Sequence, residues 1–212
     1  GSCASIQASR STWRAGSHWN ERIGESEADI LWGYPGLELN VKPGVLRWCM
    51  VVAIRHRFIS PDHNFFGHHG RPAGENPTVE VKTVMCRAGH GVEGDRFFDY
   101  RPDYPGQITF FAAEVFEELC AALEVRDITP AALRRNAIVR GVDLLVLVGQ
   151  EFTLQGVRFR GASECKPCYW MDQAIAPGAE AWLRGRGGLR ARILSAGCLQ
   201  VGQADFAWST SA

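Results

Sequence analysis

The stretch EFTLQGVRFRGASECKPCYWMD, residues 151–172, joins an expected β-hairpin to a pair of cysteines. Gln155 and Gly156 separate two strand-like runs, which is typical of a two-residue hairpin turn. Cys165 and Cys168 follow the second run, with a lysine and a proline between them. Because loops on a rigid scaffold commonly carry function, this thiol pair is predicted to be the centre of the chemistry.

Similar strand-like runs occur through most of the chain. The expected strands are 45–60, 78–86, 106–111, 136–144, 144–149, 151–161 and 189–197, and the expected helices are 112–125, 129–134 and 179–183. The pattern contains no βαβ alternation, and neither GHGVEG nor GRGGL is a dinucleotide-binding fingerprint. The sequence therefore predicts a mainly β (α+β) fold, a strand-rich barrel with a few short peripheral helices.

Composition restricts the classes of partner and the compartment. Lys and Arg number 23 and so do Asp and Glu, giving no net charge to attract nucleic acid or an acidic membrane surface. No apolar run reaches the roughly 18 residues that a membrane span needs. Seven cysteines cannot all pair internally, which favours free thiols in a reducing, cytoplasmic setting. We expect no nucleic acid partner and no membrane association.

Hydrophobic periodicity also suggests the domain organisation. Residues 1–48 include a long Ser-, Gly- and Arg-rich stretch without helical or strand period, so we expect a loosely ordered extension. The periodic part, residues 49–206, is predicted to be one domain, and residues 207–212 a short tail.

Four interpretations of the thiol pair remain open on the residues alone. The spacing of Cys165 and Cys168 suits a redox pair, or half of a zinc site completed by His68 and His69. A thiolate could instead bind a transition metal held mainly by an organic cofactor. The fourth interpretation, two inert buried thiols, is disfavoured because Glu164 and Lys166 make full burial costly.

Cationic side chains cluster in three segments of the chain. Arg134 and Arg135 precede Asn136, and Arg96 lies in a glycine-rich turn. Four more arginines flank GRGGL, namely Arg184, Arg186, Arg190 and Arg192. Guanidinium groups suit phosphate or carboxylate, and glycine loops let backbone N–H groups approach an anion. Together the segments predict a site for an anionic ligand, if the fold brings them together.

Several of these motifs occur in the order found in one known family. GVEGDRF, GQITFF, RRNAIVRGVDL, LVGQEF, CKPCYWMD and GRGGLRARILSAG together resemble MOSC domains, the C-terminal domains of molybdenum cofactor sulfurases, which also occur in amidoxime-reducing proteins. The resemblance covers roughly residues 50–205. It implies a strand-rich barrel, in agreement with the strand pattern, and a thiol that serves as molybdenum ligand or sulfur carrier.

The resemblance also assigns roles to residues. By motif position Cys168 is the implied catalytic thiol and metal ligand, and Cys165 is an accessory. Arg134 and Asn136 match an Arg-x-Asn segment expected near the cofactor, the molybdenum cofactor (molybdopterin), and we add Arg96 and Lys166 as further cofactor-binding residues. The implied activity is reduction of N-hydroxylated small molecules, with electrons from an external electron-donor protein. The alternatives are a sulfur carrier with a persulfide on Cys168 and a zinc-stabilised binding module.

Two segments depart from the family pattern. The loop PDHNFFGHHGRPAGENP and the aromatic run RFFDYRPDY, residues 61–77 and 96–104, differ from its commoner members. Such loops would shape a substrate pocket, so the resemblance does not identify the substrate. The chain also contains no segment matching the aminotransferase-like domain of full sulfurases, and pyridoxal phosphate chemistry is not expected here.

The lack of periodicity in the first 44 residues gives a testable prediction. Deleting residues 1–44 should change the melting temperature by less than about 5 °C, which for a domain of this size is roughly 1 kcal/mol. The measurement is thermal unfolding of the full and shortened chains. A larger decrease would show that the extension packs on the core.

Overall fold

The β-branched runs form strands that close into a barrel. The computed structural model describes residues 38–42, 45–65 and 70–211. Seven strands pair in the order β2-β12-β8-β9-β10-β6-β7, and β7 pairs again with β2 to close the barrel. All of these pairs are antiparallel except β6 with β7. The strands are β2 (Val45–Ile59), β6 (Ile108–Ala112), β7 (Ala137–Arg140), β8 (Glu151–Leu154), β9 (Val157–Glu164), β10 (Leu189–Ile193) and β12 (Gly202–Ser211).

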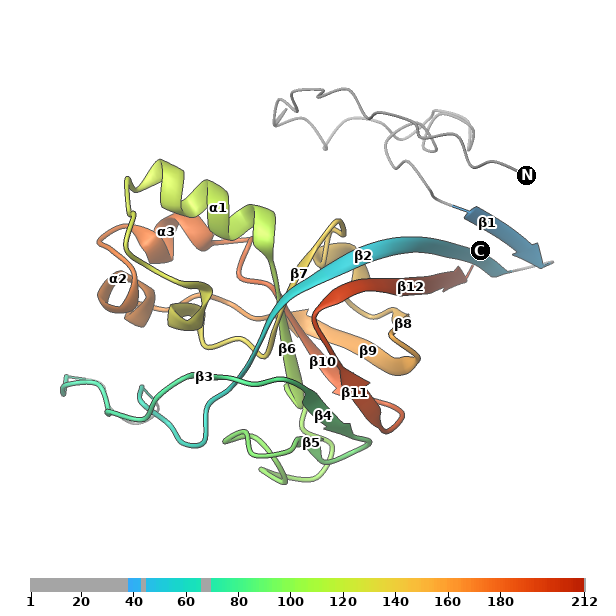
Figure 1. Ribbon diagram of the computed structural model, residues 1–212, viewed down its shortest axis with the longest axis horizontal. Helices are drawn as coiled ribbons and strands as arrows, with labels where there is room; N and C mark the ends of the chain where they lie inside the picture. Colours follow the sequence, from blue (N-terminus) through green and yellow to red (C-terminus); the bar gives the residue numbers. More distant parts are fainter. Residues whose placement is uncertain (1–37, 43–44, 66–69, 212) are drawn as a thin grey trace, which may run out of the picture. The chain divides into compact units, whose positions relative to one another are not determined.

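Short elements surround the barrel. Strands β1 (Glu38–Lys42) and β3 (Val79–Glu80) pair with β2, while β11 (Gly197–Leu199), β4 (Val84–Arg87) and β5 (Gly91–Val92) form a small second sheet. Helices α1 (Ala113–Ala122), α2 (Trp170–Ala174) and α3 (Ala179–Leu183) lie together on one side of the barrel (Figure 1). Two 3₁₀ turns are η2 (Pro130–Leu133) and η3 (Leu145–Leu147). No helix in the part that the structure describes is long and apolar enough to cross a membrane.

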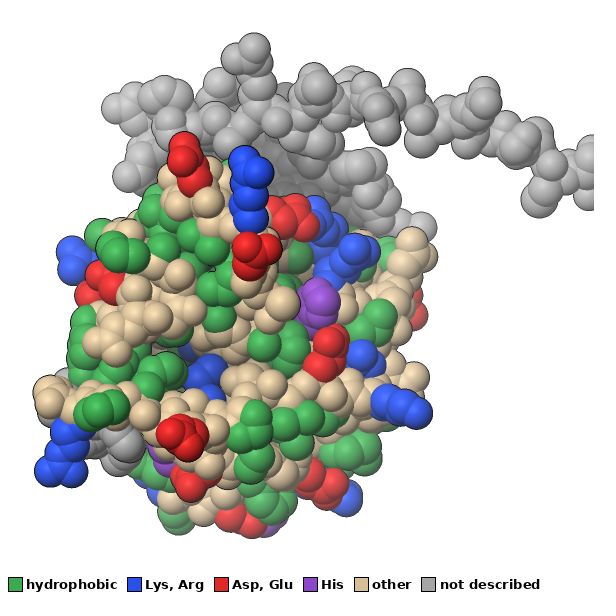
Figure 2. Space-filling view, turned by 60° about the vertical axis from the view of Figure 1, so that its left-hand side comes forward, with side chains coloured by type: hydrophobic (Ala, Val, Ile, Leu, Met, Phe, Trp, Pro, Cys, Tyr) green, Lys and Arg blue, Asp and Glu red, His purple; other side chains and the backbone are tan. Residues whose placement is uncertain are grey.

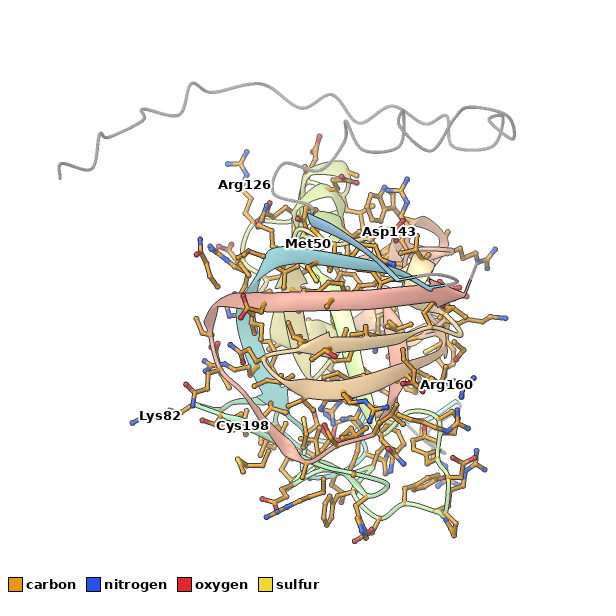
Figure 3. All side chains as sticks on the ribbon, turned by 90° about the vertical axis from the view of Figure 1, so that its right-hand side faces the viewer. Met50, Lys82, Arg126, Asp143, Arg160 and Cys198 are labelled. Atoms are coloured by element: carbon orange, nitrogen blue, oxygen red, sulfur yellow. The ribbon has the colours of Figure 1, made fainter. Side chains whose placement is uncertain are left out.

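Alternation along the strands fills the barrel with apolar side chains. In β10, Leu189, Ala191 and Ile193 are buried, whereas Arg190 and Arg192 between them are not, because successive side chains of a strand point to opposite faces. Aromatic rings from four strands pack in the interior, namely Phe110, Phe152, Phe159 and Phe206. Figure 3 shows β2, β12, β8 and β9 side by side in the barrel wall. A second apolar cluster, which includes Phe111, Leu119, Leu133 and Leu183, packs beneath the helices.

The predicted hairpin and the predicted fold class are both confirmed. Strands β8 and β9 pair antiparallel from Glu151 opposite Arg160 to Leu154 opposite Val157. Gln155 and Gly156 form the turn with φ angles of 48° and 77°, and two positive φ angles are what a type I′ hairpin turn requires.

Other predicted elements differ from the structure in type or in length. Within the predicted strand 144–149, Leu145–Leu147 form the 3₁₀ turn η3. The Asp143 carboxylate accepts a hydrogen bond from Leu145 N at 2.9 Å, which favours a local turn. The short helix at Pro130 ends at Leu133, and Arg134 takes a left-handed conformation with φ 52°. Strand β12 was not predicted.

The domain limits fall within strands. Strand β2 crosses the predicted boundary between residues 48 and 49, and β12 continues into the predicted tail through Ser211. Residues 1–37 of the predicted extension lie outside the described residues. Strand β1 lies within the extension that was predicted to be loosely ordered, and it pairs with β2 over Glu38–Lys42.

The close approach of Gly161 in β9 to Leu147 in η3 gives a stability prediction. A Cβ atom on Gly161 would overlap the carbonyl oxygen of Leu147, and Gly161 also bonds Gly149 and Gln150 through its backbone. Gly161→Ala should therefore lower the free energy of unfolding by about 3 kcal/mol, as measured by chemical denaturation.

Gly156→Ala in the same hairpin is the matched control. Its φ is 77°, but a Cβ there meets no atom within 4 Å, so only the backbone strain of about 1 kcal/mol applies. Equal losses in the two variants would contradict the close-contact explanation for Gly161.

Candidate functional site

Segments far apart in the sequence meet around one cavity of about 300 Å³. It is formed by the loop after β2, the turn after β5, the segment between η2 and β7, and β10. The loop between β9 and α2, residues 165–169, completes it and is called the thiol loop below. Figure 2 shows the side of the molecule that carries the helices, with Lys or Arg side chains visible inside a hollow. The lining includes Arg96, Arg134, Arg135, Lys166 and Arg190, together with both cysteines of the thiol pair.

The two thiols differ in their surroundings. Cys165 is buried at 4% exposure, and its sulfur accepts a hydrogen bond from Arg190 Nε at 3.4 Å. Cys168 is exposed and lines the cavity. The Cys168 carbonyl accepts the Met171 N–H at 2.8 Å, which ties the thiol loop to the start of α2. The cavity therefore presents one accessible thiol, while the other is held inside the protein.

The thiol loop packs closely against the backbone of Gly187 and Gly188. Cys165 N donates to Gly188 O at 2.8 Å, and Gly187 N donates to Glu164 Oε1 at 3.1 Å. A Cβ on Gly187 would overlap the Cys165 carbonyl, and one on Gly188 would overlap that of Phe110. The GRGGL segment was considered as part of an anion site, but Gly187 instead allows the close approach of the thiol loop, and Gly188 that of β6.

The buried arginines are fixed by backbone carbonyl groups. Arg134 donates to Asp62 O at 2.6 Å and to Asn76 O at 3.0 Å, which anchors the loop after β2. Arg135 donates to Leu133 O at 2.8 Å and to Cys165 O at 3.2 Å. Carbonyl partners hold a guanidinium in place without neutralising its charge.

Carboxylates are scarce at this site. Among the described residues no Asp or Glu lines the cavity, and Asp95 Oδ2 lies 3.6 Å from Arg96 as the one ion-pair partner of the five cations. Asp95 also accepts hydrogen bonds from Ser60 N and Asn136 Nδ2, each at 3.0 Å. One carboxylate against five cationic groups leaves a strong excess of positive charge, which suits an anionic ligand.

The electrostatics of the arginines reflect this crowding. Burial, reinforced by the positive charge of Arg96, lowers the pKa of the Arg134 guanidinium to about 10. Burial also lowers the pKa of Arg96, where Asp95 opposes the effect and Arg135 adds to it. Both groups remain charged at neutral pH, and a bound anion would relieve the repulsion between them.

The predicted site residues are thus only partly brought together. Cys168, Cys165, Arg134, Arg96 and Lys166 line the cavity, and Lys166 is exposed. Asn136 does not line it. The Asn136 amide instead links Asp95 to Thr109, accepting from Thr109 N at 3.0 Å and from Thr109 Oγ1 at 2.9 Å. Asn136 therefore positions Asp95, and through it Arg96.

Sequence reasoning left several lining residues out of the predicted site. Arg135 and Arg190 were recognised only as members of arginine clusters. The period-2 pattern of 189–193 places Arg190 and Arg192 on the same face of a strand, so it could not distinguish between them. Arg190 lines the cavity, whereas Arg192 pairs with Asp103. Arg184 and Arg186 pair with Glu180 and Glu118 on the surface. Aromatic lining residues outside the predicted set are His63, Phe65, Phe97, Tyr104 and Trp170.

The predicted zinc ligands are only partly described. His68 and His69 lie outside the described residues. Within the described ranges, no three His, Cys, Asp or Glu side chains gather as a metal site would require. The zinc hypothesis therefore gains no support from this part of the chain.

Comparison with known proteins identifies the family. The family model described as MOSC domain matches residues 90–204, more than half of the chain. The chain belongs to the MOSC domain family. No curated protein matches it.

Solved structures share this MOSC fold. The YUAD protein from Bacillus subtilis is similar with a TM-score of 0.60 and 19% identity, over 77% of this chain and 98% of that one. YiiM from Geobacillus stearothermophilus is similar with a TM-score of 0.53 and 16% identity, over 72% of each chain. At these identities the likeness establishes the fold alone.

The crowded cations of the MOSC cavity give a pH prediction through His63. Burial, with Arg96 adding to it, lowers the pKa of His63 below the ordinary 6.5. The folded protein then binds this proton less readily than the unfolded chain, so stability is lost as the pH falls through 6.5. Thermal unfolding is compared at about pH 7.5 and about pH 5.5, on either side of the ordinary histidine pKa. Between these two values the melting temperature of His63→Gln should decrease less than that of the unchanged protein. Parallel pH profiles would contradict this electrostatic environment.

Proposed function

We propose that this protein binds the molybdenum cofactor in the cavity and reduces N-hydroxylated small molecules, with Cys168 as the molybdenum ligand. The observation that carries the proposal is an exposed thiol on a cavity with five cationic side chains. Membership of the MOSC family supports the same cofactor.

The residues of the cavity fit such a group. Thiolate is a soft ligand that suits a transition metal, and guanidinium groups suit the phosphate of a pterin cofactor. The Nε1 donor of Trp170 is buried and has no partner among the described residues, so a ligand in the cavity could accept its hydrogen bond. The aromatic side chains of Phe65 and Phe97 also line the cavity and offer surfaces for a planar ring.

Each side chain then has a distinct role. The bound cofactor would supply two-electron redox chemistry at its metal. Cys168 would bind the metal, while Arg96, Arg134, Arg190 and Lys166 would hold the anionic part of the cofactor. Arg135 would hold the thiol loop through the Cys165 carbonyl, and Asn136 would orient Asp95. We further propose that the electrons come from an external electron-donor protein and that the protein is cytoplasmic.

A second candidate function is sulfur delivery. In this case Cys168 would carry a persulfide for assembly of a metal–sulfur cofactor. Its exposure favours this function, because a partner protein could reach the sulfur, whereas the buried Cys165 could not take part directly.

Paired cysteine variants test the metal-ligand assignment. Cys168→Ser replaces a soft thiolate by a hydroxyl that stays protonated at neutral pH. We expect reductase activity to fall more than about 100-fold, since even outer-shell partners of a metal contribute 10–100-fold. Cys165→Ser is the matched control and should lose less than about 10-fold, because its hydroxyl can still accept from Arg190.

The other hypotheses give different results in the same experiment. A redox pair requires both thiols, so equal losses would contradict the single-ligand assignment. Sharp loss of thermal stability in either variant would indicate a structural zinc site. Cyanide-releasable sulfur that disappears only in Cys168→Ser, without molybdenum in the unchanged protein, would indicate the sulfur carrier.

A further inference from the structure

Tyr104 lies in the aromatic segment that departs from the family pattern, and its side chain lines the same cavity as the thiols. The residue is 9% exposed. Among the residues that the structure describes, its hydroxyl has no hydrogen-bond partner. The Thr109 hydroxyl, by contrast, donates to Asn136 Oδ1 at 2.9 Å. The phenol is therefore available to a molecule in the cavity.

Aromatic and cationic neighbours fix the ring of Tyr104. Its centroid lies 5.2 Å from that of Phe97 and 5.0 Å from that of Tyr100, and the Arg101 guanidinium lies 5.2 Å from its centre. A Cβ on Gly106 would come within 3.0–3.2 Å of the ring and the hydroxyl oxygen. Glycine at 106 thus leaves room for the hydroxyl end, and the orientation of the phenol is set before any ligand binds.

Strand β10 ties this segment to the thiol loop. Arg192 Nε donates to Asp103 Oδ1 at 2.7 Å, directly before Tyr104. Arg190, two residues earlier on the same face of β10, donates to the Cys165 sulfur. One strand therefore positions both the phenol and a guanidinium at the cavity.

The charges around Tyr104 suit a proton donor. Burial raises the pKa of Tyr104, and Arg190 partly opposes that increase. The phenol therefore keeps its proton at neutral pH. The positive charge of Arg190 would stabilise the phenolate that remains after the proton is transferred. The titratable and charged groups that influence it are Arg190, Cys165, Tyr100 and Arg101, and the cavity adds Arg96, Arg134, Arg135, Lys166, Cys168 and His63.

We propose that Tyr104 is the general acid that protonates the leaving oxygen when an N-hydroxylated substrate is reduced in this cavity. The inference rests on the proposed function. In the balanced reaction, R–NH–OH takes up two electrons and two protons to give R–NH₂ and water. The N–O bond breaks, the Tyr104 proton goes to the departing oxygen, and the second proton reaches nitrogen from solvent. The electrons originate from the external donor protein, and solvent returns the proton to Tyr104.

Tyr104→Phe tests this role, because it keeps the ring and removes the hydroxyl. We expect kcat to fall about 100-fold or more, in the range of general acid catalysis, with little change in KM or in molybdenum content. The activity of the unchanged protein should fall at alkaline pH as the phenol ionises, and Tyr104→Phe should lose that alkaline limb. Tyr100→Phe is the matched control, since Tyr100 is 42% exposed and does not line the cavity, and should keep full activity.

A second measurement uses the protein without cofactor. The ultraviolet absorbance of tyrosinate is titrated in the unchanged protein and in Tyr104→Phe, and the difference reports Tyr104. Inorganic phosphate in the cavity should raise the pH at which this phenol ionises, because nearby negative charge disfavours the phenolate.

The outcomes separate this inference from the proposed function. An active reductase whose Tyr104→Phe variant matches Tyr100→Phe overturns the proton-donor role alone. If phosphate raises the melting temperature, and therefore binds, but leaves the titration of Tyr104 unchanged, the placement of the hydroxyl next to the ligand is overturned. A protein that binds molybdenum but shows no reductase activity overturns the proposed reaction and the proton transfer with it.

Discussion

Repulsion among the guanidinium groups of Arg96, Arg134 and Arg135 is the constraint that the rest of the site accommodates. These groups are largely buried, and one carboxylate, Asp95, stands against them. Removing charges from water is costly unless they are paired or hydrogen-bonded. Backbone carbonyls of three different segments accept the N–H groups of Arg134 and Arg135. The same bonds hold those segments together, so the charge that would attract a ligand also organises the walls of its cavity.

The barrel makes this arrangement rigid. Closure through β2 and β7 places Asn136, directly before β7, where its amide donates to Phe58 O in β2 and to Asp95. Strand β10 carries Arg190 to the thiols and Arg192 to the aromatic segment. Sites built on strands are more precise than sites built on loops alone. Cys168 is the accessible group on this scaffold, and Cys165 belongs to the support beneath it.

Much of the fold was predictable from sequence, because strand formation follows local pattern. The hairpin at Gln155 and Gly156 and strand β10 follow directly from turn chemistry and period-2 alternation. Residues 144–149 were mistaken for a strand, since their apolar run hides the turn that Asp143 promotes. Strand β12 has alternating Ala204 and Phe206 in the core, but its polar residues concealed the pattern. Strand β12 pairs with β2 and β8, which are distant in the sequence, so a short stretch of sequence cannot predict this pairing.

The residues that line the cavity could be predicted only in part from the sequence, and the chemistry assigned to them stays a prediction. The spacing of the cysteines and the arginine clusters indicated a thiol and an anion site, and five of the six predicted residues line one cavity. Which arginines face it depends on tertiary packing: Arg190 lines the cavity, whereas Arg184 and Arg186 pair with surface glutamates. Asn136 matched a motif, yet its amide is used inside the protein. Tyr104 carried no local signal beyond its place in an aromatic run.

The central claim is that this cavity holds the molybdenum cofactor, and the cofactor content of the purified protein tests it most directly. Protein from a host that makes the cofactor would be analysed for metals, for pterin and for sulfane sulfur. The account predicts molybdenum and pterin in equal amounts, and neither in protein from a host unable to make the cofactor. Stoichiometric zinc, or sulfane sulfur without molybdenum and pterin, would contradict it.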